Sequence, residues 1–459
     1  MTETISVTSP YDGRQVGEVP RHGDDDIDRA VDRAAQLHRR GALPAHERAA
    51  VLDRAAAAIE GDPDRFARII CDEAAKPIST ARTEVARAID TFRFSAAAAR
   101  TVAGELVPMD ASSAGEGKLG LVMRVPRGVV VGISPFNFPL NLVAHKVAPA
   151  IAAGCPIILK PATATPLTAL ELARLLGECG LPEGWLQVLT VRGSDTNRLV
   201  EHPDVAMITF TGSPDVGWAI RERVPRKEVG LELGNNTPVI VEPGVDVDAV
   251  AAALAVAGNG FAGQSCISVQ RIYAHAEVAD RLTDALVREV DALVVGDPSD
   301  DATQVSALID EGEAERVAGW VDEAAQAGAT VCTGASRDGA VLRPTVLSGI
   351  TPAMKVSARE VFGPVVGVAT YTDLEEAMAR ANDTVYGLQA GIFTPDLDVA
   401  LRAARTLDFG AVVVNEVPTF RTDQMPYGGV RDSGNTREGP AYAVEDMTER
   451  RLVVIDRPL

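Results

Sequence analysis

The sequence lacks the features that mark several special classes of protein. It holds no uninterrupted apolar stretch of about 18 residues, and residues 1–10 contain no basic segment followed by an apolar run. We therefore expect neither a transmembrane helix nor a secretory signal. Positive charge is in deficit, with 44 Lys and Arg against 64 Asp and Glu, a net charge of -20. This balance argues against broad electrostatic binding to nucleic acid or to an anionic membrane.

Cysteine and lysine are both scarce. Five scattered cysteines without a CxxC pair argue against a disulfide framework and a zinc site, so we expect no metal and a reducing, cytoplasmic location. Six lysines stand against 38 arginines, which makes the position of each lysine informative. With 459 residues, of which 46% are hydrophobic, the chain can build two or three structural units.

An alternating pattern of strands and helices is present from residue 128 onward. The N-terminal region before it has helical spacing of apolar residues. Amphipathic segments at 140–153 and 167–179 separate short β-branched runs, which predicts right-handed βαβ units around a buried parallel sheet. The predicted strands are 128–133, 156–160, 186–190, 205–210 and 229–233. A second alternating region, 238–415, predicts a second α/β unit.

No GxGxxG motif follows the first predicted strand, so the usual dinucleotide fingerprint is missing. A different turn, Thr211, Gly212 and Ser213, follows a strand and precedes a helical stretch. Free backbone N–H groups and the helix dipole make such a turn a candidate anion site. The alternative is a plain helix start with Ser213 as an ordinary N-cap.

Four residues are candidates for chemistry, each with a simpler alternative. Cys266 follows Gly263 in a segment of small and polar residues, although most cysteines are inert and buried. Glu232 lies between leucines at a strand end and could serve a structural ion pair. Asn137 and Lys160 also follow strands, at the edge where open α/β sheets bind ligands, but fit an Asx turn and a solvated strand end equally well.

Taken together, eight segments resemble the aldehyde dehydrogenase superfamily over nearly the whole chain. In family order they are GISPFNFPL (132–140), KPATATP (160–166), FTGS (210–213), LELG (231–234), GQSC (263–266), EVFGP (360–364), NDTVYGL (382–388) and PYGGVRDSG (426–434). The segments QSCISVQR and MPYGGVRDSG are most similar to the lactaldehyde and phosphonate-pathway aldehyde dehydrogenases.

The resemblance implies a covalent mechanism at Cys266. Its thiolate would attack the aldehyde, and the amide of Asn137 with the backbone N–H of Cys266 would hold the oxyanion. After hydride transfer, Glu232 would activate water to hydrolyse the thioester. Lys160 completes the implied catalytic set. The alternatives are a CoA-acylating semialdehyde dehydrogenase, a cysteine hydrolase without cofactor, and a non-enzymatic binding protein on the same fold.

The resemblance also implies a cofactor, NAD or NADP. Strongly NAD-preferring relatives often carry glutamate at the position of Thr163, and threonine removes its repulsion of a 2′-phosphate, so we expect NADP to be accepted. Asn235 departs from the more common glycine, without a consequence we can predict. The implied cofactor contacts are Ile133, Ser134, Pro135, Phe136, Lys160, Thr163, Gly193, Phe210, Thr211, Gly212, Ser213, Val216, Leu233, Glu360 and Phe362.

Two arginines indicate a short polar or anionic aldehyde. Arg421 falls in the loop that lines the substrate tunnel of the family, and Arg93 falls on a helix that borders it. Arginine is suited to bind carboxylate and phosphate groups. Phe138 is the third implied substrate contact. The alternative is that both arginines form surface salt bridges.

The complete prediction is an α/β protein with a small β arm. We expect a Rossmann-like dinucleotide-binding domain at 1–103 and 127–234 and an α/β catalytic domain at 235–430. Residues 104–126 and 431–459 form the expected oligomerisation arm and tail, because an exposed hairpin and a terminal strand present edges that seek partners. We therefore expect a homodimer or homotetramer.

Overall fold

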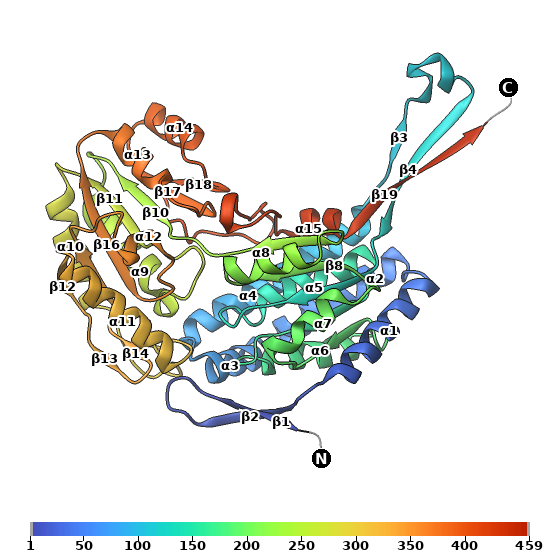
Figure 1. Ribbon diagram of the computed structural model, residues 1–459, viewed down its shortest axis with the longest axis horizontal. Helices are drawn as coiled ribbons and strands as arrows, with labels where there is room; N and C mark the ends of the chain where they lie inside the picture. Colours follow the sequence, from blue (N-terminus) through green and yellow to red (C-terminus); the bar gives the residue numbers. More distant parts are fainter. Residues whose placement is uncertain (1–2, 457–459) are drawn as a thin grey trace.

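The first α/β unit is built on a parallel five-stranded sheet. A computed structural model describes residues 3–456 (Figure 1). The strand order is β7-β6-β5-β8-β9, and every neighbouring pair is parallel. The strands are β5 (Val129–Ile133), β6 (Ile157–Lys160), β7 (Leu186–Val188), β8 (Val205–Thr211) and β9 (Glu228–Glu232). All five strands predicted from the β-branched runs are confirmed.

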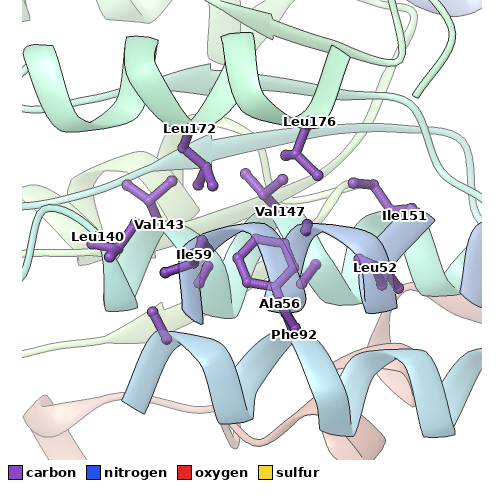
Figure 2. Close-up of a cluster of buried hydrophobic side chains, with 14 of the residues drawn as sticks. Leu52, Ala56, Ile59, Phe92, Leu140, Val143, Val147, Ile151, Leu172 and Leu176 are labelled. Atoms are coloured by element: carbon purple, nitrogen blue, oxygen red, sulfur yellow. The ribbon is translucent and has the colours of Figure 1, made fainter. Parts of the chain in front are cut away.

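Helices cover both faces of this sheet and create two separate cores. One core surrounds α5, in which every residue is buried because α2, α4 and α6 pack around it (Figure 2). The other core lies between the opposite face of the sheet and α1, α7 and α8. The helices are α1 (Asp24–Arg40), α2 (Ala45–Gly61), α3 (Pro63–Ala74), α4 (Ile78–Thr101), α5 (Asn141–Ala153), α6 (Leu167–Glu178), α7 (Thr196–Glu201) and α8 (Pro214–Arg223).

The second α/β unit contains a seven-stranded sheet in the order β12-β15-β16-β11-β10-β17-β18, where only the β12–β15 pair is antiparallel. Its strands are β10 (Pro238–Val241), β11 (Arg271–His275), β12 (Thr330–Thr333), β15 (Thr345–Ser348), β16 (Val365–Tyr371), β17 (Gln389–Phe393) and β18 (Ala411–Val414). Its helices are α9 (Val247–Asn259), α10 (Ala279–Asp291), α11 (Glu311–Gln326), α12 (Lys355–Ala358), α13 (Leu374–Asn382) and α14 (Leu397–Thr406). The predicted α/β fold class is confirmed.

A three-stranded antiparallel arm projects from the body of the molecule (Figure 1). β4 (Lys118–Pro126) lies between β3 (Glu105–Val107) and β19 (Thr448–Asp456), and α15 (Pro440–Asp446) leads into β19. The arm exposes apolar side chains, including Leu106 and Leu452 at 66% and 53%. Its role in oligomerisation and the domain boundaries stay predictions. No helix within residues 3–456 is long and apolar enough to cross a bilayer.

Two hairpins were not predicted. β1 (Thr4–Thr8) pairs with β2 (Gln15–Pro20), and β13 (Arg337–Asp338) pairs with β14 (Val341–Leu342). Their strands are mostly exposed, so hydrophobic periodicity gives only a weak signal there.

Candidate active site

A cleft of about 510 Å³ lies at the carboxyl ends of the strands of the first sheet and extends to the second α/β unit. Parallel strands end at the same edge, so the segments that follow β5, β8 and β9 meet there. Asn137, Ser213 and Glu232 line the cleft from this side. Cys266 and Glu360 line it from the second unit, which places residues from both units around one space.

A strained turn presents Cys266 to the cleft. Phe261 and Ala262 have φ of 49° and 52°, a region that L-residues rarely adopt, directly after helix α9. Gly263 follows with φ 68°, and a Cβ there would lie 2.1 Å from the carbonyl oxygen of Gly363. The side chain of Gln264 accepts the backbone N–H of Ile309 at 2.8 Å and fixes the turn from the other side.

Asn137 is tied to this turn by a hydrogen bond. Its Nδ2 donates to the backbone oxygen of Gln264 at 2.9 Å, and the side chain is buried. An amide nitrogen carries two hydrogens, so one N–H is used to hold the turn and the other remains for a ligand beside Cys266. This contact spans the two α/β units, and an Asx turn does not account for it.

The sulfur of Cys266 shares a hydrogen bond with a tyrosine. Sγ lies 2.7 Å from the hydroxyl of Tyr427. Burial raises the pKa of the Cys266 thiol to about 12. The hydrogen bond of Tyr427 and the charge of Arg421 act in the opposite direction and lower the pKa. The thiolate therefore depends on nearby donors and cations for its stability.

Glu232 ends β9 as a buried carboxylate that is 4% exposed. Neither oxygen has a hydrogen-bond partner in the described part of the chain, so the structural ion pair considered from sequence is wrong. Burial, and then the charge of Glu438, raise the pKa of Glu232 well above its ordinary value. Gly428 makes room for the carboxylate, since a Cβ there would lie 2.7 Å from Oε1.

The turn after β8 fits an anion at the N-terminus of α8. Ser213 is the N-cap residue of α8, as the N-cap alternative expects, but its side chain makes no capping hydrogen bond. The hydroxyl lines the cleft with Thr211 and Gly212. α8 has ten residues, long enough for its N-terminal N–H groups and dipole to attract a phosphate.

The other cofactor candidates divide into residues that line the cleft and residues outside it. Glu360 accepts the backbone N–H of Asn235 at 3.0 Å, and burial raises its pKa to about 7. Near it, Phe362 packs edge-on against Phe136 at 5.8 Å. The remaining cleft residues among the candidates are Pro135 and Leu233.

The candidates outside this cleft differ in exposure. Thr163 is exposed at a separate recess beside Ala162, while Lys160 is buried at the end of β6 and donates to the oxygen of Pro161 at 3.1 Å. Ile133, Ser134 and Phe210 are buried, and Gly193 and Val216 are exposed.

Asn235 has a structural function that the sequence did not predict. Its Nδ2 donates to Thr237 at 2.8 Å and to the oxygen of Gln389 at 3.0 Å. The side chain thereby ties the segment after β9 to β17.

A buried network of charged groups lies behind the cleft, and most of its members were missed from sequence. Arg421 Nη2 donates to Glu438 at 2.7 Å and lies 3.2 Å from His145. His145 contacts Asp423 at 2.9 Å, which also accepts Arg87 at 2.9 Å. Arg421 is 6% exposed, so the surface salt-bridge alternative is wrong for it.

Lys146 joins this network to the anion turn. Its Nζ donates to Thr211 at 2.6 Å and lies 3.7 Å from Glu438. The scarcity of lysine was a usable signal for Lys146, and the PYGG motif already contained Tyr427. No comparable sequence signal indicated Glu438 or His145.

The structure does not bring Arg93 to the cleft. Its side chain is 48% exposed and pairs with Glu60 at 2.6 Å, so the surface alternative holds for Arg93. The arginine of α4 that reaches the buried network is Arg87, six residues earlier. Phe138 is half-buried with the ammonium of Lys76 3.7 Å from its ring centroid.

Comparisons with known proteins agree with this geometry. The chain belongs to the aldehyde dehydrogenase family, whose model matches residues 1–453. The 3-sulfolactaldehyde dehydrogenase of Priestia aryabhattai is 43% identical over 99% of this chain and 95% of that protein. Both the predicted family and the prediction of an enzyme are confirmed.

Two solved structures share the fold closely. Aldehyde dehydrogenase 21 from Physcomitrella patens, in complex with the reaction product succinate, has a TM-score of 0.96 at 39% identity and covers 99% of this chain and 95% of that one. The NADP-dependent glyceraldehyde-3-phosphate dehydrogenase from Bacillus halodurans C-125, complexed with NADP, has a TM-score of 0.96 at 36% identity, covering 99% and 96%.

Proposed function

We propose that this chain oxidises a short anionic aldehyde to its carboxylic acid through a thioester on Cys266, with NAD or NADP as the oxidant. The observation that carries the proposal is the meeting of Cys266, Asn137 and the unpaired Glu232 in one cleft. A nucleophile, an oxyanion donor and a base within one space are what acyl chemistry on a cysteine requires.

Each of the three residues has a distinct task. The thiolate of Cys266 attacks the carbonyl carbon, and the free N–H of Asn137 with the backbone N–H of Cys266 stabilises the negative oxygen. Glu232 then takes a proton from water, which adds to the thioester and expels the thiolate. An unpaired carboxylate with a raised pKa suits this step, and it favours hydrolysis over acyl transfer to CoA.

The cofactor fits the residues present. When bound, NAD(P) supplies the acceptor for the hydride of the thiohemiacetal. Ser213 and the N-terminus of α8 would hold the pyrophosphate of the cofactor. Glu360 and Phe362 would hold its nicotinamide riboside. Thr163 is exposed and brings no negative charge, so we propose that NADP is accepted.

Three relatives support an anionic substrate. One is named for a sulfonated aldehyde and one for a phosphorylated aldehyde, and the third was solved in complex with the dicarboxylate product succinate. In this chain, Arg421 has a buried Nε without a hydrogen-bond partner among residues 3–456, and Arg87 is linked to it through Asp423 and His145. We propose that Arg421 and Arg87 hold the anionic group.

A panel of aldehydes with both cofactors tests the proposal. We expect reduced cofactor and carboxylic acid in equal amounts, with highest kcat/KM for sulfonated, carboxylated or phosphorylated aldehydes. Cys266→Ser should abolish oxidation, and full activity in that variant would refute the thioester. Thr163→Glu should lower kcat/KM with NADP about tenfold by charge repulsion, while the neighbouring Ala164→Glu serves as the matched control.

A further inference from the structure

The hydroxyl of Tyr427 is placed for a single contact. Tyr427 is 2% exposed, and Cys266 Sγ is the only hydrogen-bond partner of its hydroxyl in the described ranges of the chain. Its backbone is fixed by an antiparallel bridge to Glu438. The bridge holds the ring in a rigid loop, so the hydroxyl is aimed at the sulfur by the fold rather than by a flexible side chain.

A cation lies over the same ring. The guanidinium of Arg421 lies 3.7 Å from the ring centroid of Tyr427, and Glu438 anchors it there at 2.7 Å. A cation over an aromatic face withdraws electron density from the ring, which makes the phenolic O–H a stronger donor. The same positive charge favours a thiolate beside the hydroxyl.

The direction of the hydrogen bond between Tyr427 and Cys266 depends on which of the two groups carries a proton. Burial raises the pKa of Tyr427 well above its ordinary value, and the charge of Cys266 raises it further. The phenol therefore keeps its proton at neutral pH and does not serve as the base that deprotonates the thiol. In the thiolate state, the hydroxyl must be the donor and the sulfur the acceptor.

We propose that Tyr427 is a further catalytic residue, whose hydroxyl donates a hydrogen bond to the Cys266 thiolate and thereby stabilises both the attacking and the leaving sulfur. The inference rests on the proposed nucleophilic role of Cys266. The thiol first releases its proton to water in the cleft. The carbon–sulfur bond then forms as the carbonyl π electrons move to oxygen, and Tyr427 keeps its own proton throughout. Bound NAD(P) would accept the hydride of the thiohemiacetal. When water then displaces the sulfur from the thioester, the carbon–sulfur electron pair returns to a thiolate that Tyr427 again stabilises.

Two substitutions with opposite expected effects test the donor. Tyr427→Phe keeps the ring under Arg421 and removes only the hydroxyl, whereas 3-fluorotyrosine at position 427 makes the phenol a stronger donor. The readout is the rate of Cys266 alkylation by iodoacetamide between pH 7 and pH 9.5, with the modified cysteine located by mass spectrometry. We expect Tyr427→Phe to lower the rate at least tenfold at each pH, and fluorotyrosine to raise it, because the thiolate fraction follows donor strength.

A matched control separates this role from packing. Tyr371→Phe also removes a buried hydroxyl, which is bonded to Val241 and Glu242 away from the cleft, and should leave alkylation of Cys266 unchanged. Alkylation rates within twofold of the unsubstituted protein in Tyr427→Phe would overturn the inference. If Cys266→Ser instead retained aldehyde oxidation, the proposed function itself would fail.

Discussion

Two buried carboxylates, one that lines the cleft and one in the charged network behind it, differ in their partners and in their pKa. Glu232, on the wall of strand ends, is 4% exposed and has no partner, and its pKa is raised. Glu438, in the network behind the cleft, is 5% exposed, but Arg421 outweighs burial and lowers its pKa to about 2. Nearly equal burial is thus accompanied by opposite shifts of the pKa, because only Glu438 is paired with a cation. The unpaired carboxylate is free for proton transfer, and the paired one holds a cation in place.

The largest expected effect follows from removing the unpaired carboxylate. Glu232→Gln should lower turnover by about 10²–10⁴-fold, because the amide cannot accept a proton from water. One equivalent of reduced cofactor per site should still form in a burst, and the thioester should accumulate on Cys266 in the intact mass. Glu228→Gln, on the same strand but exposed, is the control. Steady turnover without a burst in Glu232→Gln would contradict the prediction.

Removing the paired carboxylate should instead reduce stability. Glu438→Gln leaves the buried guanidinium of Arg421 without its partner, and loss of one member of a buried pair costs about 3–5 kcal/mol. Denaturant unfolding measures the effect. Glu323→Gln breaks a half-exposed pair with Lys355 and should change stability by less than about 1 kcal/mol. An equally small change in both variants would show that the pair contributes little.

The pH dependence of hydrolysis separates the two carboxylates further. Below its raised pKa, Glu232 is protonated and cannot act as a base, so the hydrolysis rate should rise about tenfold per pH unit up to that pKa. A carboxylate with the ordinary pKa of about 4.3 would give a flat profile from pH 6 to pH 9. Single-turnover decay of the thioester measures the profile. Glu438→Gln should move it to lower pH, because a neighbouring negative charge is removed.

The smallest effects compare two arginines of α4. Arg87→Ala removes a cation of the buried network and should raise KM for an anionic aldehyde about tenfold, with a weaker effect on a neutral one. Arg93→Ala breaks a surface pair with Glu60 and should leave the kinetics unchanged. It should change the free energy of unfolding by less than about 0.5 kcal/mol. Equal effects of both variants on KM would refute the placement of the anion site.

Much of the fold could be predicted from local pattern. All five strands of the first sheet coincide with predicted β-branched runs, and the signal is clearest for β5, which is buried along its whole length and apolar throughout. The hairpin β1–β2 was missed because its exposed strands carry little hydrophobic signal. Arg93 was chosen on the correct helix, but its sequence position did not reveal that Arg87 is the arginine that reaches Asp423.

The sequence by itself determined the strands of the first sheet, the strand ends where Asn137, Ser213 and Glu232 lie, and the family. Only the tertiary structure decided which charges are paired. Arg421 meets His145 across 276 residues of sequence, and Tyr427 meets Cys266 across 161. Such contacts leave no local periodicity, since each partner is chosen by the packing of distant segments. For this reason, the contrast between the unpaired Glu232 and the paired Glu438 exists only in the folded chain.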